Sequence, residues 1–156
     1  MARAEAATGR RGARGERAAP GLSERELRAL LDEVLTEVDD DAKSGALLRA
    51  AGLRVRFRFP DLGMVLNVAP SDEPGRHLRW RFSDDVDWEP KLELVMDSDV
   101  ANAYLQGTES IAIAIARGRV RASGDTRCAL LYVPALRLVG DSYRRHVRAE
   151  HPHLAV

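Results

Sequence analysis

The sequence predicts an α+β fold with five strands, because helical and strand-like hydrophobic patterns occupy separate stretches of the chain. Residues 27–38 place leucine and valine at the three- and four-residue spacing of one helix face. Segments between residues 53 and 96 alternate apolar and polar side chains, which is typical of half-buried strands. After residue 96 the helical spacing returns, with one short strand at 119–123. Strands grouped between helical segments favour the α+β class.

The first helix is expected to begin at Ser23. Ser23 and Glu26 form a capping box, in which the serine hydroxyl accepts a hydrogen bond from a free helical N–H and the glutamate reaches back. The acidic residues 39–41 are expected to open a second, short helix, because carboxylates favour the positive end of the helix dipole. Gly52 would end this second helix.

The middle of the chain is expected to form four strands. Their predicted ranges are 53–59, 64–69, 77–82 and 91–96. In the first strand, Phe57 and Phe59 share one face and Arg56 and Arg58 share the other. The same alternation in the third strand places Trp80 on the apolar face.

The carboxyl-terminal half is expected to contain three helices and the fifth strand. Two segments that begin with capping residues end at Gly107 and Gly118. The stretch 111–115 alternates like a strand, but its alanines and its flanking cap and glycine favour a helix. The fifth strand follows at 119–123, and then a strongly apolar helical region in which Pro134 should break or kink the helix.

The 156 residues suit one domain, which is expected at 22–150. Residues 1–21 are rich in Ala, Arg and Gly and predict a disordered tail or a misassigned start, and residues 151–156 predict a frayed end. Basic and acidic side chains number 24 each, so the net charge points neither to nucleic acid nor to an anionic membrane. The single Cys128 excludes an internal disulfide, and no apolar run approaches the roughly 18 residues of a membrane span, which favours a cytoplasmic protein.

Residues 91–139 contain a recognisable series of motifs. They read Lys-Leu-Glu-Leu-Val-Met-Asp-Ser-Asp, then a helix ending in Gly107, then Ala-Ile-Ala-Arg-Gly-Arg-Val-Arg-Ala-Ser-Gly-Asp and an apolar tail. This series resembles the sterol carrier protein type two family, and the order of elements agrees over residues 23–148. The amino-terminal strands carry no motif of that family. The resemblance implies a five-stranded sheet covered on one face by helices, with an apolar tunnel between sheet and helices.

The expected function is the binding of a hydrophobic ligand such as a sterol, fatty acid or acyl chain in an internal cavity, which could extend to intracellular transfer. Burial would drive this binding, at about 0.8 kcal/mol for each methylene. Neither a cofactor nor a catalytic residue is expected. The side chains predicted to line the pocket are Phe57, Trp80, Phe82, Leu94, Met96, Val100, Tyr104, Ile111, Ile115, Leu130, Leu131 and Leu136.

Two other functions remain open. The chain could be a non-catalytic accessory or dimerisation module with the same fold and a filled cavity, in which residues 128–139 would meet a partner or form a homodimer. It could also be a small enzyme that acts on a hydrophobic substrate, with Asp99 or Tyr104 in the cavity.

The remaining motifs do not point to nucleic acid, metal or catalysis. Arginines gather on the outer sheet face, at Arg54, Arg56, Arg58, Arg79, Arg81, Arg119 and Arg121. The aromatic side chains lie on the opposite face, which argues against base stacking. A solvated face is one interpretation, and transient contact with an anionic membrane is another. None of the four histidines has an acidic residue at ligand spacing, so no metal site is expected, and no catalytic signature occurs.

Overall fold

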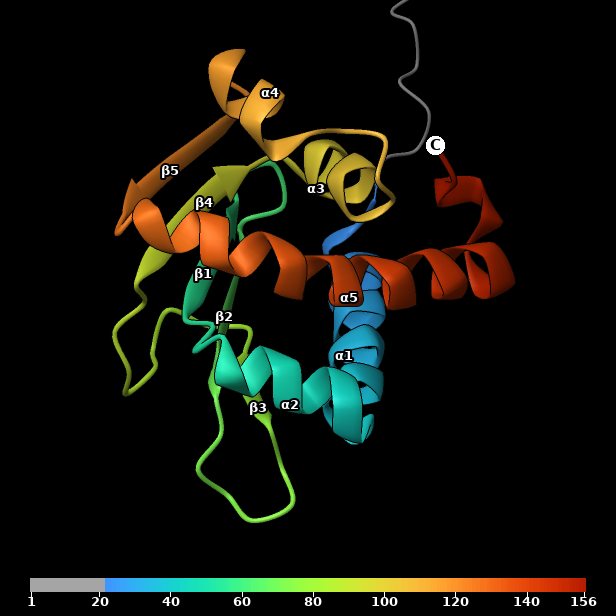
Figure 1. Cartoon of the computed structure of the whole chain (residues 1–156). Coiled ribbons are helices and arrows are strands. Elements are labelled where there is room, and N and C mark those ends of the chain that lie inside the picture. Colours follow the sequence, from blue (N-terminus) through green and yellow to red (C-terminus); the bar gives the residue numbers. More distant parts are fainter. Residues whose placement is uncertain (1–21) are drawn as a thin grey trace, which may run out of the picture.

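The computed structural model describes residues 22–156, apart from the side chain of Leu130, and its centre is one five-stranded sheet (Figure 1). The strands are β1 (Val55–Phe59), β2 (Met64–Pro70), β3 (Leu78–Arg81), β4 (Leu92–Met96) and β5 (Val120–Gly124). The helices are α1 (Glu24–Asp40), α2 (Ala42–Ala50), α3 (Ser98–Leu105), α4 (Ile111–Ala116), α5 (Arg127–Glu150) and the short 3-10 helix η1 (Pro152–Leu154). The predicted tail at 1–21 lies outside the described residues.

The sheet has the strand order β3-β2-β1-β4-β5. Its central strand β1 is antiparallel to β2 and parallel to β4, while the other neighbours are antiparallel. Phe57 lies opposite Leu66 on β2 and Leu94 on β4, so an apolar row crosses the face that α1, α3 and α5 cover. The predicted α+β class, the five strands and the helices on one face are therefore confirmed.

Helix α1 begins as predicted and buries one stripe. The Ser23 hydroxyl accepts a hydrogen bond from the Glu26 N–H at 3.1 Å. The buried stripe consists of Leu27, Leu30, Leu31, Val34, Leu35 and Val38. Each such side chain contributes about 1.5–3 kcal/mol when it leaves water, so the stripe fixes the face that α1 turns toward the sheet.

The acidic residues after α1 have two different roles. Asp41 caps α2 as predicted, because its carboxylate accepts a hydrogen bond from the Ser44 N–H at 2.8 Å. Asp39 is buried and accepts hydrogen bonds from the backbone N–H groups of His77 (2.7 Å) and Leu78 (2.8 Å). The end of α1 is thereby joined to the start of the edge strand β3.

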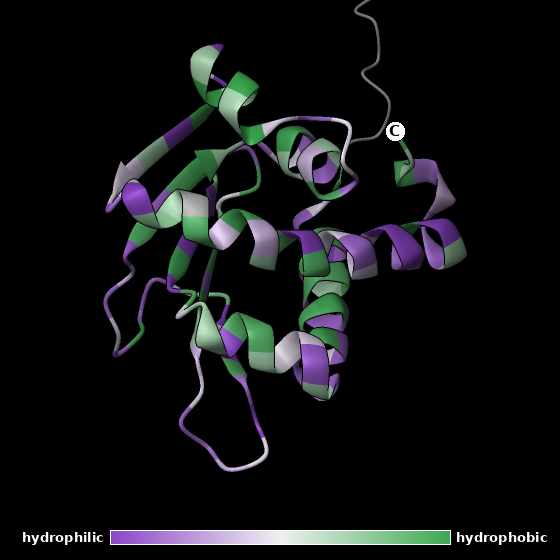
Figure 2. Cartoon of the chain, in the orientation of Figure 1, coloured by the Kyte–Doolittle hydropathy of each residue, from purple (hydrophilic) through white to green (hydrophobic). Residues whose placement is uncertain are grey.

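Helices α3 and α4 both form where the sequence predicts them. Asp97 occupies the N-cap position of α3, but the carboxylate of Asp61 accepts the hydrogen bond of the Ser98 N–H at 2.9 Å. Helix α4 is hydrophobic along most of its length (Figure 2), and yet Ile113 is half exposed.

The predicted break at Pro134 is wrong, since α5 runs through this residue as one helix. The proline ring lies on the exposed side, and buried residues on both sides of it hold the helix against the rest of the fold. Tyr132 donates a hydrogen bond to the Gly52 carbonyl at 3.1 Å, and Tyr143 donates one to Asn102 at 2.7 Å. Tertiary packing therefore compensates for the backbone hydrogen bond that a proline cannot donate.

The carboxyl end is held in place, where the sequence predicts a frayed segment. Leu154 is buried, and its carbonyl accepts hydrogen bonds from Asn102 at 2.9 Å and from Gln106 at 2.8 Å. His153 and His151 lie against Glu26 of α1. The last residues thus connect α3 to the amino-terminal end of α1.

The outer face of the sheet is charged, as predicted, but several of its arginines form ion pairs within the chain, namely Arg56, Arg58, Arg79 and Arg119. Arg58 forms ion pairs with Asp84 at 2.8 Å and with Glu93 at 3.1 Å. Arg79 lies beside Asp87 and over the Trp88 ring, 4.4 Å from its centroid. The acidic loop between β3 and β4 therefore neutralises much of this face.

Candidate ligand cavity and groove

An apolar cavity of about 40 Å³ lies between the inner face of the sheet and helices α1, α3 and α5. Its lining comprises Leu31, Leu35, Leu53, Phe57, Phe59, Leu66, Val68, Met96, Ala101, Tyr104, Leu105, Leu136 and Val139. The small side chain of Ala101 on α3 faces the phenylalanines of β1 across this space, which leaves the space unfilled. The cavity occupies the place where the sequence predicts a tunnel.

The cavity is small in the state that the structure describes. An apolar cavity of roughly 150 Å³ is needed to admit benzene, and a sterol or acyl chain needs more. A lipid could enter only if the surrounding side chains or helices moved apart.

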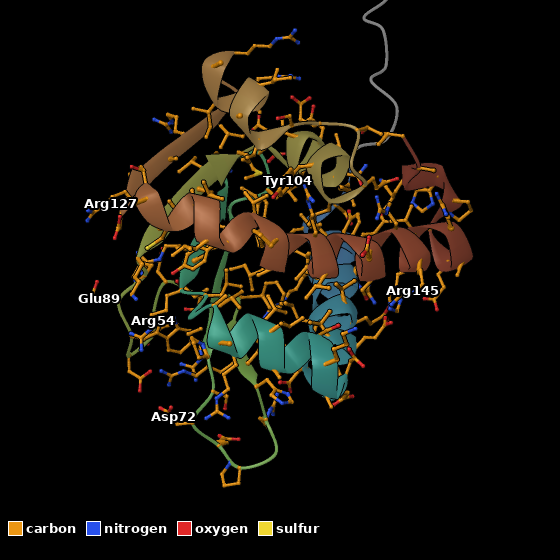
Figure 3. The ribbon with its side chains drawn as sticks, in the orientation of Figure 1. Arg54, Asp72, Glu89, Tyr104, Arg127 and Arg145 are labelled. Atoms are coloured by element: carbon orange, nitrogen blue, oxygen red, sulfur yellow. The ribbon has the colours of Figure 1, made fainter. Side chains whose placement is uncertain are left out.

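A larger, open groove of about 410 Å³ lies next to this cavity, between α5 and the segment from α3 to α4. Tyr104, Leu105 and Leu136 line both spaces and therefore separate them. Figure 3 shows Tyr104 between α3 and α5. Burial raises the pKa of Tyr104 and the nearby positive charge of Arg137 partly opposes this, so the hydroxyl stays protonated at neutral pH.

The close approach of α3 and α5 determines the shape of the groove. A Cβ atom at Gly140 would lie 2.9 Å from the Leu105 carbonyl oxygen, so only glycine allows this contact. Gly107 has a φ of +82°, and a Cβ there would lie 3.0 Å from a guanidinium nitrogen of Arg144. These two glycines let both sides of the groove come together.

Several of the predicted pocket residues lie at these two spaces. Phe57, Met96, Tyr104 and Leu136 line the inner cavity, and Ile111 lines the groove. Leu94 and Val100 are buried in the same core but do not line the cavity. The side chain of Leu130 lies outside the described residues.

Other predicted pocket residues lie elsewhere. Trp80 and Phe82 are on the predicted side of the sheet, but the edge position of β3 places them beside α1, where the Trp80 ring N–H donates to Asp32 at 2.9 Å. Phe82 stacks under Arg28 of the same helix. Ile115 is 42% exposed and Leu131 is 67% exposed, because each faces away from the core on its helix.

Sequence reasoning missed the lining residues of α1 and β2. Leu31 and Leu35 belong to the stripe that the sequence identifies, and Leu66 and Val68 alternate along β2. The hydrophobic periodicity of α1 and β2 assigns these residues to a buried face. It does not show which other element packs against that face.

Two groups of histidine and acidic side chains correct the expectation that no histidine has an acidic partner. Glu26, His151 and His153 bring their ligand atoms within 4.8 Å of one another, and so do Glu33, His146 and Glu150. The partners are far apart in the sequence, so only the fold reveals them. In the second group, His146 of α5 lies 3.6 Å from the Glu33 carboxylate of α1, and the same imidazole contacts Glu37 at 2.6 Å, so these side chains join the two helices.

Within residues 22–156, no helix is both long enough and apolar enough to cross a membrane. No protein-family model matches the sequence, and no curated protein matches it either.

Solved structures resemble the chain in fold. The ubiquinone synthesis protein UbiJ-SCP2 has a TM-score of 0.51 and 17% identity, and the match covers 72% of this chain and 87% of that protein. Sterol carrier protein 2 from Yarrowia lipolytica has a TM-score of 0.52 and 8% identity over 74% of this chain and 90% of that one.

An inverting sec-alkylsulfatase, Pisa1 from Pseudomonas sp., has a TM-score of 0.51 and 14% identity over 67% of this chain. The chain spans only 15% of the length of that enzyme. At these identities the similarity concerns the fold. With its sheet order, its covering helices and these structural matches, the chain has the fold of sterol carrier protein 2.

Proposed function

We propose that this chain binds a hydrophobic ligand, such as a sterol, fatty acid or acyl chain, in an expanded form of the inner cavity, and that this binding serves intracellular transfer. The observation that carries the proposal is an apolar cavity between sheet and helices in a chain with the sterol carrier protein 2 fold. A ten-carbon tail would gain several kcal/mol from burial alone, at about 0.8 kcal/mol for each methylene.

Expansion is part of the proposal, because the cavity of about 40 Å³ cannot hold such a tail. Tyr104, Leu105 and Leu136 are the side chains whose movement would join the cavity to the neighbouring groove. The two spaces together offer several hundred cubic ångströms, which is within the usual size of a ligand site.

The proposal includes no catalytic step and no membrane contact. Asp99 is exposed and does not line the cavity. The pKa of Tyr104 is raised by burial, so its hydroxyl is a weaker acid and stays protonated at neutral pH. Arg56, Arg58 and Arg79 of the outer face pair with Asp84 or Asp87 of the acidic loop, which weakens the positive potential that an anionic membrane would need.

Filling the cavity tests the proposal. Ala101→Leu adds three carbon atoms to the cavity wall, and Ala103→Leu makes the same change on α3 at a position that does not line it. A fluorescent fatty acid should bind the Ala101→Leu variant about tenfold more weakly, because roughly two methylenes lose their place. Binding to the Ala103→Leu variant should be unchanged.

Absence of fatty acid and sterol binding to the unmodified protein would reject the proposal. In that case the alternative, an accessory or dimerisation module with a filled cavity, would be supported by concentration-dependent association in sedimentation experiments.

A further inference from the structure

The groove beside the inner cavity contains one positive charge that no other group of the described chain balances. Four charged residues line it, namely Glu109, Arg137, Asp141 and Arg144. Glu109 pairs with Arg119 at 2.7 Å, and Asp141 pairs with Arg144. Among the residues that the structure describes, Arg137 forms no ion pair.

Arg137 also lies next to the partition between the two spaces. It follows Leu136, which lines both of them, and its charge acts on the hydroxyl of Tyr104. An apolar chain that passed between Tyr104, Leu105 and Leu136 would leave its end group in the groove near this guanidinium. Guanidinium groups bind carboxylates and phosphates through paired N–H donors.

We propose that the groove between α5 and the α3–α4 segment is the mouth of the ligand site, and that Arg137 binds the anionic head group of an amphiphile there. This inference rests on the proposed function, because it needs an apolar tail in the inner cavity. It narrows the ligand class from any hydrophobic molecule to one with a single negatively charged end, a carboxylate or a phosphate monoester.

The unpaired positive charge of Arg137 is the reason to expect an anionic ligand and not a neutral one. A neutral sterol would leave Arg137 solvated at the groove and would gain nothing from it. A fatty acid carboxylate would form a charge-assisted hydrogen bond with the exposed guanidinium of Arg137 in the groove. The preference for the acid over its neutral ester should weaken as salt concentration rises.

The role of the Arg137 charge is tested by comparing the affinities of a fluorescent fatty acid, its neutral methyl ester and the corresponding alkyl phosphate. The unmodified protein should bind both anions roughly three- to tenfold more tightly than the ester. Arg137→Gln keeps the length of the side chain and should abolish this preference while ester binding stays the same. Arg148→Gln, at an exposed position on the same helix, is the matched control and should retain the preference.

The outcomes distinguish a failure of the head-group site at Arg137 from a failure of lipid binding as such. Equal binding of acid and ester by the unmodified protein, or a preference that survives in Arg137→Gln, would overturn the head-group site and leave the lipid-binding function standing. Failure of all the probes to bind would overturn both. A preference for only one of the two anions would identify the head group as carboxylate or phosphate.

The position of the mouth is tested by association rates of the methyl ester. Leu105→Ala and Leu31→Ala both enlarge the inner cavity, but only Leu105 also borders the groove. Ester uptake should therefore be several-fold faster in Leu105→Ala than in Leu31→Ala. Equal acceleration in both variants, or acceleration in Leu31→Ala alone, would place the mouth elsewhere. The Leu→Val pair gives the same comparison if the buried Leu31→Ala variant does not fold.

Discussion

Single side chains connect distant parts of this fold, and Glu37 is a clear example. Burial alone would raise the pKa of the Glu37 carboxyl, but hydrogen bonds from Ser142, Arg145 and His146 outweigh this and lower it from 4.5 to about 2. The carboxylate on α1 thus binds three side chains of α5. A depressed pKa in the folded state means that the ionised form stabilises the fold.

The pH dependence of stability should follow from this. The contribution of Glu37 is fully present above pH 4.5 and is lost as the pH falls toward 2, because the unfolded state takes up the proton first. The side chain is 40% exposed, so solvent screening limits the contribution to about 1 kcal/mol. The free energy of unfolding of Glu37→Gln should be lower than that of the unmodified protein at neutral pH, and the difference should shrink between pH 4.5 and 2. A constant difference would contradict this.

Individual residues also show how much of the candidate cavity could be predicted from the sequence. The faces of Phe57 and Met96 were predictable, because alternation assigns every side chain of a strand to one face. Trp80 has the right face but the wrong neighbours, since its strand forms the sheet edge and faces α1. The pairing of His153 with Glu26 had no local signal at all.

At the scale of elements, the edge strand β3 depends on a carboxylate outside the sheet. Asp39 at the end of α1 accepts hydrogen bonds from two successive N–H groups of the chain entering β3. Asp39→Ala should cost roughly 2–4 kcal/mol, because both buried donors lose their acceptor. Amide exchange of His77 and Leu78 should become faster.

Asp39→Asn keeps an acceptor oxygen and is the control for this prediction. It should lose less stability than Asp39→Ala in urea denaturation. Equal loss in both variants would mean that the charge of Asp39, which also faces Arg76 at 3.4 Å, matters more than its hydrogen bonds.

A second prediction at the scale of elements concerns Pro134 in helix α5. Pro134 stands inside a continuous helix, with its ring exposed, and removes one backbone hydrogen bond there. Pro134→Ala should therefore raise the free energy of unfolding by about 1–3 kcal/mol, as measured in urea. An unchanged or lower stability would indicate that packing requires the local geometry that proline imposes.

Most elements were predictable because their signals are local. A cap at Ser23, a stripe of leucines and two-residue alternation each depend on neighbouring residues only. The continuity of α5 and the docking of η1 depend on contacts with residues far away in the sequence, such as Tyr132 with Gly52 and Leu154 with Asn102. These tertiary contacts overrule the local signals of Pro134 and of the carboxyl end.

At the scale of the whole molecule, the sheet and its covering helices nearly fill the space between them. The fold is that of sterol carrier protein 2, but the remaining cavity of about 40 Å³ is much smaller than a lipid. The proposed binding of a lipid therefore depends on whether α3 and α5 separate to connect this cavity with the groove. The matched variants at Ala101 and Leu105 examine the two parts of this question separately.

The most direct measurement is native mass spectrometry of the purified full-length protein, followed by solvent extraction and identification of any bound lipid. If the chain binds a lipid, the spectrum should contain a population heavier than the bare chain by the mass of one apolar molecule, and this population should increase when a fatty acid is added. A spectrum that contains only the bare chain, both before and after addition of fatty acids and sterols, would contradict lipid binding by this chain.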